Sequence, residues 1–242
     1  MGNLFISKDQ NNMIKPSIQQ NDSLKKLLHG VIWDMDGVLI DSMEIHFEIW
    51  KEVFSEFGVQ FERKLFNRHF GTTNMETVRT VLGDRLSHQE ALALAEKRQD
   101  LFEQAAIHQA QLIPGVMHWL EFFQQNKISQ AVASSNAQQF IESIAVRLEI
   151  SPFFDAIVSA ENLASKPDPA VFLETARRIR AMPSHCLVIE DAMAGVEGAR
   201  RAGMKCIAIA TTNPPSALSD ADLVISSFSA LSIQQLTAVM QK

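Results

Sequence analysis

The chain has 242 residues, of which 46% are hydrophobic and 21% charged, and its formal net charge is −6 at pH 7. The length favours one or two domains, and the composition is that of an ordinary globular protein. The acidic balance argues against nucleic-acid binding, which needs a basic face, and no apolar run approaches the roughly 20 residues of a membrane helix.

The N-terminal segment, residues 1–23, is rich in Asn, Gln, Ser and Lys and predicts a mobile tail. It lacks the basic and then apolar regions of a secretory signal, and Ile6 occupies the position where a myristoylation motif needs Ser or Thr. The two cysteines, Cys186 and Cys206, stand far apart among apolar residues, which favours buried thiols over a disulfide. We therefore expect a cytoplasmic protein.

Six short apolar runs rich in β-branched residues follow the tail. They are residues 30–33, 129–133, 156–158, 186–189, 206–209 and 223–225. Most lack polar alternation, as expected of parallel strands buried on both faces. Helical patterns lie between most of them, at 116–125, 137–148, 169–180 and 195–202. This alternation of strands and helices predicts an open α/β sheet.

The interval between the first two strands breaks this alternation. It contains only helical patterns, at 43–57, 63–70, 75–82 and 88–106, and Pro114-Gly115 marks its end. We therefore expect a small helical domain at 43–112, inserted into a core formed by 24–42 and 113–242. Ligands bind beyond the carboxyl ends of the strands in an open α/β sheet, so the insertion starts where it can cover such a site.

Acidic residues follow two of the predicted strands. Asp34 ends the first strand, Asp36 lies in the next turn beside Gly37, and Glu190-Asp191 ends the run 186–189. Ordinary turn chemistry explains Asp36 and Gly37 taken alone, and a helix N-terminus explains a single acid better than two. Acids at the ends of two strands favour a metal site, because a hard cation such as Mg²⁺ removes the repulsion between carboxylates.

Two further loops carry groups that suit a phosphate. Ser134 to Asn136 follow the second predicted strand, where a hydroxyl and the N–H groups of the next helix can hold an anion, although helix capping is the alternative. Lys166 stands in the segment SKPDP, whose prolines restrict the backbone, and a solvated loop lysine is the alternative there. The ordered succession of these groups at strand ends favours catalysis over chance.

The motifs DMDGVLIDS, VASSN, SKPDP and VIEDAMAGVEGARRAG, in this order, resemble those of the haloacid dehalogenase-like superfamily of phosphatases and phosphomutases. The resemblance runs from about residue 30 to 225 and is closest to the branch of β-phosphoglucomutase and sugar-phosphate phosphatases. It implies a Rossmann-like parallel sheet with helices on both faces, and an all-helical cap inserted after the first motif. The motifs are specific for the superfamily and far less specific for the substrate.

The resemblance also implies roles for the acidic residues. Asp34 would be the nucleophile that becomes an aspartyl-phosphate, and Asp36 the general acid and then the general base. Mg²⁺ would be held by the Asp34 carboxylate, the Asp36 carbonyl and Asp191, with Glu190 binding directly or through water. We expect the metal to keep Asp34 ionised. We also expect distance from the metal and exclusion of water by the cap to raise the pKa of Asp36.

The remaining motif residues would bind the transferred phosphoryl group. The resemblance implies that Ser134, Ser135 and Lys166 hold its oxygens. Phosphoryl transfer needs mainly positioning and charge neutralisation, and this set of residues supplies both.

The predicted cap resembles that of β-phosphoglucomutase in its first helix, which includes His46 and Trp50. Many phosphatases of the branch also have this histidine, so His46 discriminates little, and a partly buried helix histidine is the alternative. We expect Trp50 to belong to the hydrophobic core of the cap. We expect His46, Asn136 and the cap loop described next to contact the substrate.

The loop HFGTTNMETV, with Thr72 and Asn74, resembles the cap loop that reaches the substrate. The mutase uses an arginine there to bind the second phosphate of its substrate, whereas this chain has Asn74, and Arg68 and Arg79 are out of register. An amide cannot neutralise a phosphate dianion as a guanidinium does. This difference favours a phosphatase, with water as the second acceptor.

The sequence therefore predicts a Mg²⁺-dependent phosphatase that hydrolyses a small phosphorylated metabolite, a sugar phosphate, through an aspartyl-phosphate. The alternative is a β-phosphoglucomutase-like phosphomutase that uses a different cation. Asp36 and the Glu190-Asp191 pair argue against a metal-free dehalogenase, and the complete set of motif residues argues against a non-catalytic binding protein. We expect no nucleic-acid or membrane partner, and a monomer or weak dimer.

Overall fold

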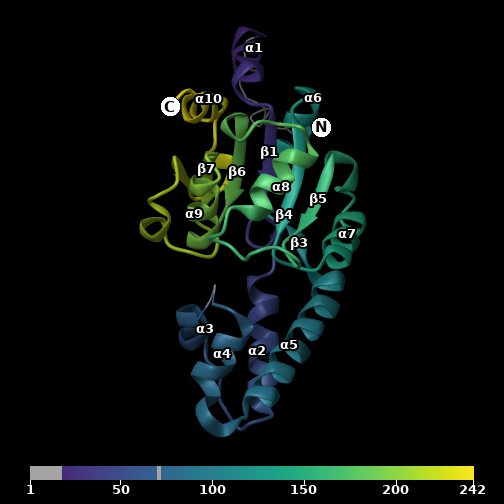
Figure 1. Ribbon diagram of the computed structural model, residues 1–242, viewed down its shortest axis with the longest axis vertical. Coiled ribbons are helices and arrows are strands. Elements are labelled where there is room, and N and C mark those ends of the chain that lie inside the picture. Colours follow the sequence, from purple (N-terminus) through teal and green to yellow (C-terminus); the bar gives the residue numbers. More distant parts are fainter. Residues whose placement is uncertain (1–17, 70–71) are drawn as a thin grey trace, which may run out of the picture.

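A parallel sheet forms the centre of the molecule in the computed structural model, which describes residues 18–69 and 72–242 (Figure 1). Its strands are β1 (Gly30–Trp33), β4 (Ser129–Ser134), β5 (Ala156–Ser159), β6 (Cys186–Glu190), β7 (Lys205–Ile209) and β8 (Leu223–Ile225). They lie in the order β5-β4-β1-β6-β7-β8, and each neighbouring pair is parallel. The predicted α/β class is therefore confirmed.

Strand β1 lies between β4 and β6, which explains its continuous apolar pattern. Gly30 is paired with Ser129 on one side and with Cys186 on the other, and all four residues of β1 are buried. Because the three strands are parallel, their carboxyl ends meet at one edge of the sheet. The residues that follow β1, β4 and β6 are thereby brought together.

Helices cover both faces of this sheet. On one face lie α6 (Val116–Gln125), α7 (Gln138–Arg147) and α10 (Ile233–Gln241), and on the other α8 (Ala170–Arg178) and α9 (Met193–Arg201). Within β1, Val31 and Trp33 belong to the first hydrophobic cluster and Ile32 to the second. This alternation follows from the two-residue period of a strand.

The helical cap lies beyond the carboxyl ends of the strands (Figure 1). It contains α2 (Met43–Ser55), α3 (Arg63–His69), α4 (Asn74–Leu82) and the long α5 (His88–Gln109). Helix α5 begins with a capping box in which Ser87 and Glu90 each bond the other's backbone N–H. The predicted helix at 63–70 ends one residue beyond α3, and residue 70 lies outside the described residues.

Two elements that the sequence pattern does not reveal join the cap to the core. They are the strands β2 (Ile40–Asp41) and β3 (Gln111–Leu112), which form a small antiparallel sheet. The largest hydrophobic cluster continues through this junction, and it holds sheet residues such as Trp33 together with cap residues such as Phe54 and Phe102. Cap and core therefore share one apolar interior within the described residues.

The predicted tail, residues 1–23, lies outside the described residues as far as residue 17. The rest belongs to α1 (Ile18–Leu27), a helix that was not predicted from the sequence. Helix α1 packs against α10, and Leu24 and Leu28 are buried. Short 3₁₀ turns at Gly83–Arg85, Ser151–Phe153, Pro183–His185, Pro215–Leu218 and Phe228–Ala230 complete the described elements.

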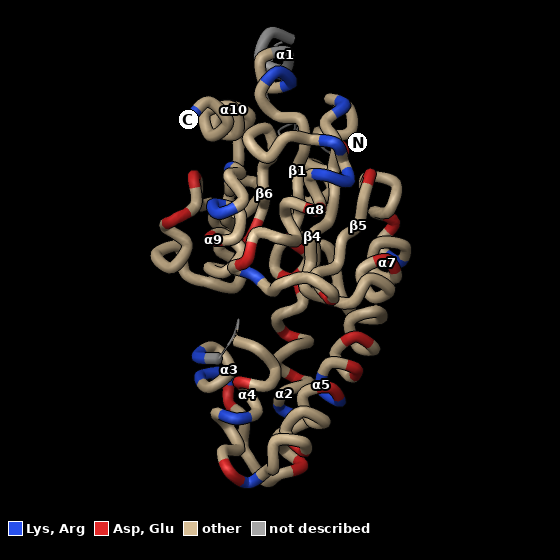
Figure 2. The backbone as a smooth tube through the Cα atoms, in the orientation of Figure 1, with Lys and Arg blue, Asp and Glu red and all other residues tan. Residues whose placement is uncertain are grey.

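Charged residues of both signs are spread over the core and the cap (Figure 2). None of the helices in the described parts of the chain is long and apolar enough to cross a membrane.

Phe123 and Phe122 are neighbours on α6 that differ in burial. Phe123 is fully buried and touches the rings of Trp33 and Trp119, whereas Phe122 is partly exposed. We expect Phe123→Ala to lower the free energy of unfolding by about 3–5 kcal/mol, because it leaves a cavity in the core. Phe122→Ala should cost clearly less. Urea titration followed by circular dichroism measures both, and equal losses would contradict this packing.

Candidate active site

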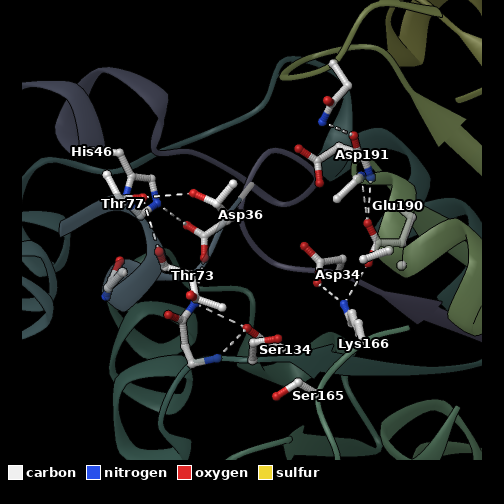
Figure 3. Close-up of a pocket in the computed structure, with 18 of the residues that line it drawn as sticks. Asp34, Asp36, His46, Thr73, Thr77, Ser134, Ser165, Lys166, Glu190 and Asp191 are labelled. Atoms are coloured by element: carbon white, nitrogen blue, oxygen red, sulfur yellow. Dashed lines mark hydrogen bonds and ion pairs between the residues drawn. The ribbon is translucent and has the colours of Figure 1, made fainter. Parts of the chain in front are cut away.

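A cavity of about 380 Å³ lies between the carboxyl edge of the sheet and the cap (Figure 3). Every site residue predicted from the sequence lines it, namely Asp34, Asp36, His46, Thr72, Asn74, Ser134, Ser135, Asn136, Lys166, Glu190 and Asp191. The core residues come from the ends of β1, β4 and β6 and from the loop before α8, and the cap residues from α2, α4 and the loop before α4. The structure thus brings together segments more than 150 residues apart in sequence.

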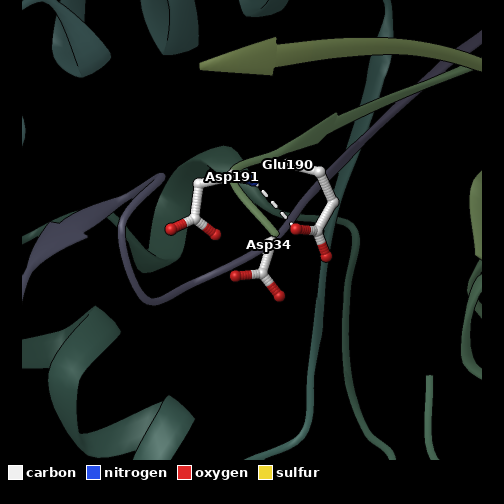
Figure 4. Close-up of side chains that lie close together, drawn as sticks. All are labelled: Asp34, Glu190 and Asp191. Carbon is white, nitrogen blue, oxygen red and sulfur yellow. Dashed lines mark hydrogen bonds between the residues drawn. The ribbon is translucent and has the colours of Figure 1, made fainter. Parts of the chain in front are cut away.

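Three buried carboxylates that line this cavity lie close together (Figure 4). Asp34, Glu190 and Asp191 each present an oxygen within 4.8 Å of the others. Burial, with Glu190 and Asp36 nearby, raises the pKa of Asp34 from 3.8 to about 8 against the opposing effect of Lys166. Burial and the charges of Glu190 and Asp34 likewise raise the pKa of Asp191. The cluster therefore resists full ionisation in the protein alone.

Lys166 neutralises part of this charge. Its Nζ lies 2.5 Å from Asp34 Oδ1 and 2.6 Å from Glu190 Oε1, and only 9% of its side chain is exposed. Burial by itself would lower the pKa of Lys166, but the charges of Asp34 and Glu190 raise it above its ordinary value. This lysine is therefore a fixed cation of the site, unlike a solvated loop lysine.

Two glycines make room for the acidic side chains. A Cβ on Gly37, whose φ is +74°, would lie 2.0 Å from Asp191 Oδ2, and a Cβ on Gly195 would lie 1.8 Å from Glu190 Oε1. Both distances are far below any real contact, and the positive φ of Gly37 is itself unfavourable for other residues. The backbone of the first motif and of α9 can approach the carboxylates this closely only at glycine.

Asp36 occupies a different environment, on the cap side of the cavity. Ser42 Oγ donates to its Oδ1 at 2.5 Å, Asn136 Nδ2 donates to its Oδ2 at 2.6 Å, and His46 Nε2 lies 3.8 Å from Oδ1. Burial alone would raise the pKa of Asp36, but hydrogen bonds from His46, Ser42 and Asn136 bring it below its ordinary value. The predicted rise in this pKa was therefore wrong for the protein without substrate, because three donors outweigh burial.

Ser134 ends β4 and is buried with its hydroxyl facing the cavity (Figure 3). This hydroxyl accepts hydrogen bonds of 3.2 Å from the backbone N–H and from the side-chain amide of Asn136. The next residue, Ser135, is exposed and also lines the cavity. The loop after β4 thus offers a hydroxyl close to the carboxylate of Asp36.

His46 is held by a cation from another cap helix. The guanidinium of Arg98 on α5 donates to His46 Nδ1, and the His46 ring stacks on Phe102 with centroids 3.8 Å apart. A guanidinium cannot accept a hydrogen bond, so Nδ1 is the acceptor and the N–H of the neutral ring is on Nε2, toward Asp36. Burial and the charge of Arg98 lower the pKa of His46. His46 is therefore neutral, and its Nε2–H faces Asp36 Oδ1 at 3.8 Å.

Arg98 is a charged cavity residue that sequence reasoning missed. Its side chain is 2% exposed, it donates to Asn74 Oδ1 at 3.3 Å, and it lies over the ring of Trp50 at 4.8 Å. Its Nε has no hydrogen-bond partner in the described parts of the chain, and burial lowers its pKa to about 10. One signal was available: Arg98 stands at a position of α5 that otherwise belongs to an apolar stripe, between Ala95 and Phe102.

Hydrogen bonds cross from the cap to the core through Gln99. Asn74 Nδ2 donates to Gln99 Oε1 at 3.0 Å, and Gln99 Nε2 donates to Asn136 Oδ1 at 3.4 Å. Because Asn136 also donates to Asp36, the cap loop and the second aspartate are linked through side chains. Asn74 therefore contacts cap residues directly and is linked to the core through Gln99. Arg79 instead bonds the carbonyl of Leu86 and does not line the cavity.

The acidic cluster suits a hard divalent cation. Its donors are carboxylate oxygens, which Mg²⁺ prefers, and a divalent cation would offset the mutual repulsion that helps to raise the pKa of Asp34 and Asp191. The Asp36 carboxylate is engaged by Ser42 and Asn136 and is not part of the cluster. The residues present therefore fit a Mg²⁺ ion.

Comparisons with known proteins agree with this site. The haloacid dehalogenase-like hydrolase family matches residues 31–209, which is more than half of the chain. A phosphorylated carbohydrates phosphatase of Thermotoga maritima is 31% identical over 184 residues, covering 74% of this chain and 84% of that protein. The β-phosphoglucomutase of Bacillus subtilis is 30% identical over 219 residues, covering 86% of this chain and 94% of that protein.

Solved structures of this family share the fold of the chain. The crystal structure of a HAD hydrolase of family IA from Entamoeba histolytica has a TM-score of 0.80 with this chain at 22% identity, covering 89% of this chain and 100% of the other. The matched region contains all four sequence motifs and the inserted cap. This chain therefore belongs to the haloacid dehalogenase-like hydrolase family.

Proposed function

We propose that this hydrolase is a Mg²⁺-dependent phosphatase that cleaves a small phosphorylated metabolite, a sugar phosphate, through an aspartyl-phosphate intermediate. The observation that carries the proposal is the opposite environment of its two aspartates. Asp34 lies in the acidic cluster against Lys166, whereas Asp36 lies apart among hydrogen-bond donors near the cap. One carboxylate can thus act as a nucleophile while the other moves a proton.

In the first step, a carboxylate oxygen of Asp34 attacks phosphorus and the bond from phosphorus to the leaving oxygen breaks. Lys166 and the hydroxyl of Ser134 bind the phosphoryl oxygens. Asp36 delivers a proton to the leaving alcohol. In the second step, a water molecule attacks the phosphorus of the aspartyl-phosphate, and Asp36 takes the proton of that water. The products are inorganic phosphate and the regenerated carboxylate of Asp34.

Asp36 must become protonated when the substrate binds, since hydrogen bonds lower the pKa of its carboxyl group in the free protein. A phosphate dianion in the cavity is a like charge near the Asp36 carboxylate and favours its protonated form. His46 stays a neutral donor because Arg98 occupies its Nδ1, so it can orient Asp36 without competing for the proton.

The cation would be held by Asp34, Asp191 and the carbonyl of Asp36, with Glu190 binding directly or through water. When bound, Mg²⁺ supplies charge neutralisation for the phosphoryl group and for the crowded carboxylates. Glu190 is already oriented, since its Oε2 accepts from the backbone N–H groups of Asp191 and Ala192 at 2.9 Å.

The cap side of the cavity favours a substrate rich in hydroxyl groups. Trp50 lines the cavity, but its ring is stacked on Phe54 and covered by the guanidinium of Arg98. Recognition by stacking on a planar ring is thereby disfavoured, and Arg98 with Asn74 offers polar contacts instead. The phosphatase from Thermotoga maritima that resembles this chain is named for phosphorylated carbohydrates, which supports this choice.

We propose that the chain acts as a monomer or weak dimer.

A β-phosphoglucomutase-like phosphomutase is the second candidate, and Arg98 is the observation that favours it. This buried guanidinium lines the cap side of the cavity beside Asn74, and no carboxylate of the described residues forms an ion pair with it. In a mutase, Arg98 would take the place of the missing cap-loop arginine and bind the second phosphate of the substrate. We rank hydrolysis first because Arg98 already donates to His46 and Asn74.

The two aspartates should respond differently to the same substitution. We expect Asp34→Asn to abolish hydrolysis of a phosphate ester and to leave no acid-trapped phosphoenzyme, because the nucleophile is lost. Asp36→Asn should lower kcat by about 10²–10⁴, the usual contribution of general acid–base catalysis. Phosphate release and labelling from a ³²P-ester measure these effects.

Asp41→Asn is the matched control for both variants. Asp41 lies in the same segment, is exposed and does not line the cavity, so its substitution should leave kcat unchanged. Full activity of Asp34→Asn would contradict the role of Asp34 as the nucleophile. Full activity of Asp36→Asn would contradict the role of Asp36 in proton transfer.

A panel of phosphorylated metabolites should separate the two candidate functions. We expect release of inorganic phosphate from sugar phosphates, because water is the second acceptor in a phosphatase. With β-glucose 1-phosphate and added glucose 1,6-bisphosphate, formation of glucose 6-phosphate should stay below phosphate release. Faster formation of glucose 6-phosphate, measured with a coupled dehydrogenase, would instead establish the mutase.

Stability should depend on pH and on Mg²⁺ together. The raised pKa of Asp34, about 8 against an ordinary 3.8, means that the native cation-free protein holds a proton that the unfolded chain has released. Its stability should therefore fall as the pH rises from about 4 to about 8. Mg²⁺ replaces that proton, so it should raise Tm more at about pH 8 than at about pH 5.5. Thermal unfolding with Mg²⁺ or with EDTA measures the effect, with NaCl as the ionic-strength control. Equal shifts at the two pH values would contradict the prediction.

A further inference from the structure

The segment Thr211, Thr212 and Asn213, which follows β7, binds two of the acidic loops. Thr211 Oγ1 donates to the carbonyl of Gly37 at 2.5 Å, in the turn that carries Asp36. Thr212 Oγ1 donates to Asp191 Oδ2. Asn213 Nδ2 donates to the carbonyl of Asp191 at 3.0 Å. Three consecutive side chains thus connect the turn after β1 to the loop after β6, and we call this segment the β7 clamp.

The position of the β7 clamp follows from the sheet. Strand β7 is the parallel neighbour of β6, with Ala208 paired to Glu190, so the residues after β7 emerge beside Asp191. The turn after β1 also reaches this point, since a Cβ on Gly37 would lie 2.0 Å from Asp191 Oδ2 and 2.8 Å from Thr212 Cγ2. Thr212 and Gly37 therefore enclose the Asp191 carboxylate from two sides.

Thr212 makes the most direct contact of the β7 clamp with the acidic cluster. Its hydroxyl also lies 3.3 Å from the carbonyl of Asp191 and accepts from Asn213 Nδ2 at 3.2 Å. A hydroxyl has one proton, and it lies closer to Asp191 Oδ2 than to the carbonyl. Once Asp191 is ionised in binding a cation, its carboxylate is also the stronger acceptor. The proton on Thr212 is therefore directed to Oδ2, which restricts rotation of the carboxylate and keeps the other oxygen available to a cation.

We propose that Thr212 is a positioning residue for the divalent cation, acting by fixing the orientation of the Asp191 carboxylate. This inference rests on the proposed function, since it assumes that Asp191 binds the cation. Groups that hydrogen-bond a metal ligand typically contribute about 10- to 100-fold to metal affinity. Thr212 itself need not touch the cation or the substrate.

The experiment measures cation binding directly, without turnover. Mg²⁺ affinity by calorimetry, and Mn²⁺ affinity by electron paramagnetic resonance, are compared for the wild-type chain, Thr212→Val and Thr212→Ser. Val keeps the shape of Thr and removes the hydroxyl, so we expect an affinity about 10- to 100-fold weaker. Ser restores the hydroxyl and should bind within about threefold of wild type. In turnover, Thr212→Val should need more Mg²⁺ for half-maximal rate and reach nearly the wild-type kcat at saturation.

Thr237→Val serves as the matched control. The Thr237 hydroxyl bonds the Ile233 carbonyl within α10, away from the cavity, so this variant should bind Mg²⁺ like wild type. Circular dichroism in EDTA checks that every variant is folded. Should Thr212→Val fail to fold, Thr212→Ala removes the same hydroxyl from a smaller side chain and decides the question.

The possible outcomes separate this inference from the proposed function. Weak binding by the Val or Ala variant, with recovery in the Ser variant, supports the role of Thr212. Wild-type affinity in folded Thr212→Val overturns it and leaves the proposed function standing. Equal weakening in Val and Ser also overturns it, because the hydroxyl is then not the cause. Absence of Mg²⁺ and Mn²⁺ binding by the wild-type chain overturns the proposed metal dependence and this inference with it.

Discussion

Repulsion among three buried carboxylates is the constraint on which the rest of the site depends. Asp34, Glu190 and Asp191 bring oxygens within 4.8 Å of one another, and burial makes each charge costly. Lys166 offsets part of the repulsion by binding two of them. Glycines in the turn after β1 and in α9 leave room for the acids to approach. The negative charge that Lys166 does not offset must be compensated by a proton or a cation. The proposed chemistry and the stability of the fold therefore depend on the same three carboxylates.

Separation of Asp36 from this cluster is what makes the neighbouring aspartates chemically different. Both follow β1, yet Asp36 is turned toward Ser42 and Asn136, which donate hydrogen bonds to it, and toward His46, whose Nε2 lies 3.8 Å from its Oδ1. Two of these partners are connected to the cap, His46 as a cap residue and Asn136 through Gln99. The cap therefore covers the cavity and also sets the environment of Asp36, the proposed proton-transfer group.

Much of the fold follows from local chemistry that a sequence displays. Runs such as 186–189 are apolar throughout, which is typical of a strand buried on both faces, and the structure has β6 there. Parallel strands bring their carboxyl ends together, so Asp34, Ser134 and Glu190 could be expected at one edge. The two-residue strands β2 and β3 could not be predicted, because so short a segment has no period. Helix α1 was also missed, since its polar composition resembles a tail and its burial depends on α10.

The sequence by itself determined the fold class, the inserted helical cap and the motif residues that line the cavity, because strand order along the chain and residue type are local information. Only the tertiary structure decided how those residues are charged and held. The low pKa of Asp36 depends on donors from α2 and from the loop after β4. Arg98 enters the cavity only because α5 packs against α2, and Thr212 reaches Asp191 only because β7 lies beside β6. Such contacts join segments far apart in sequence, and spacing along the chain does not encode them.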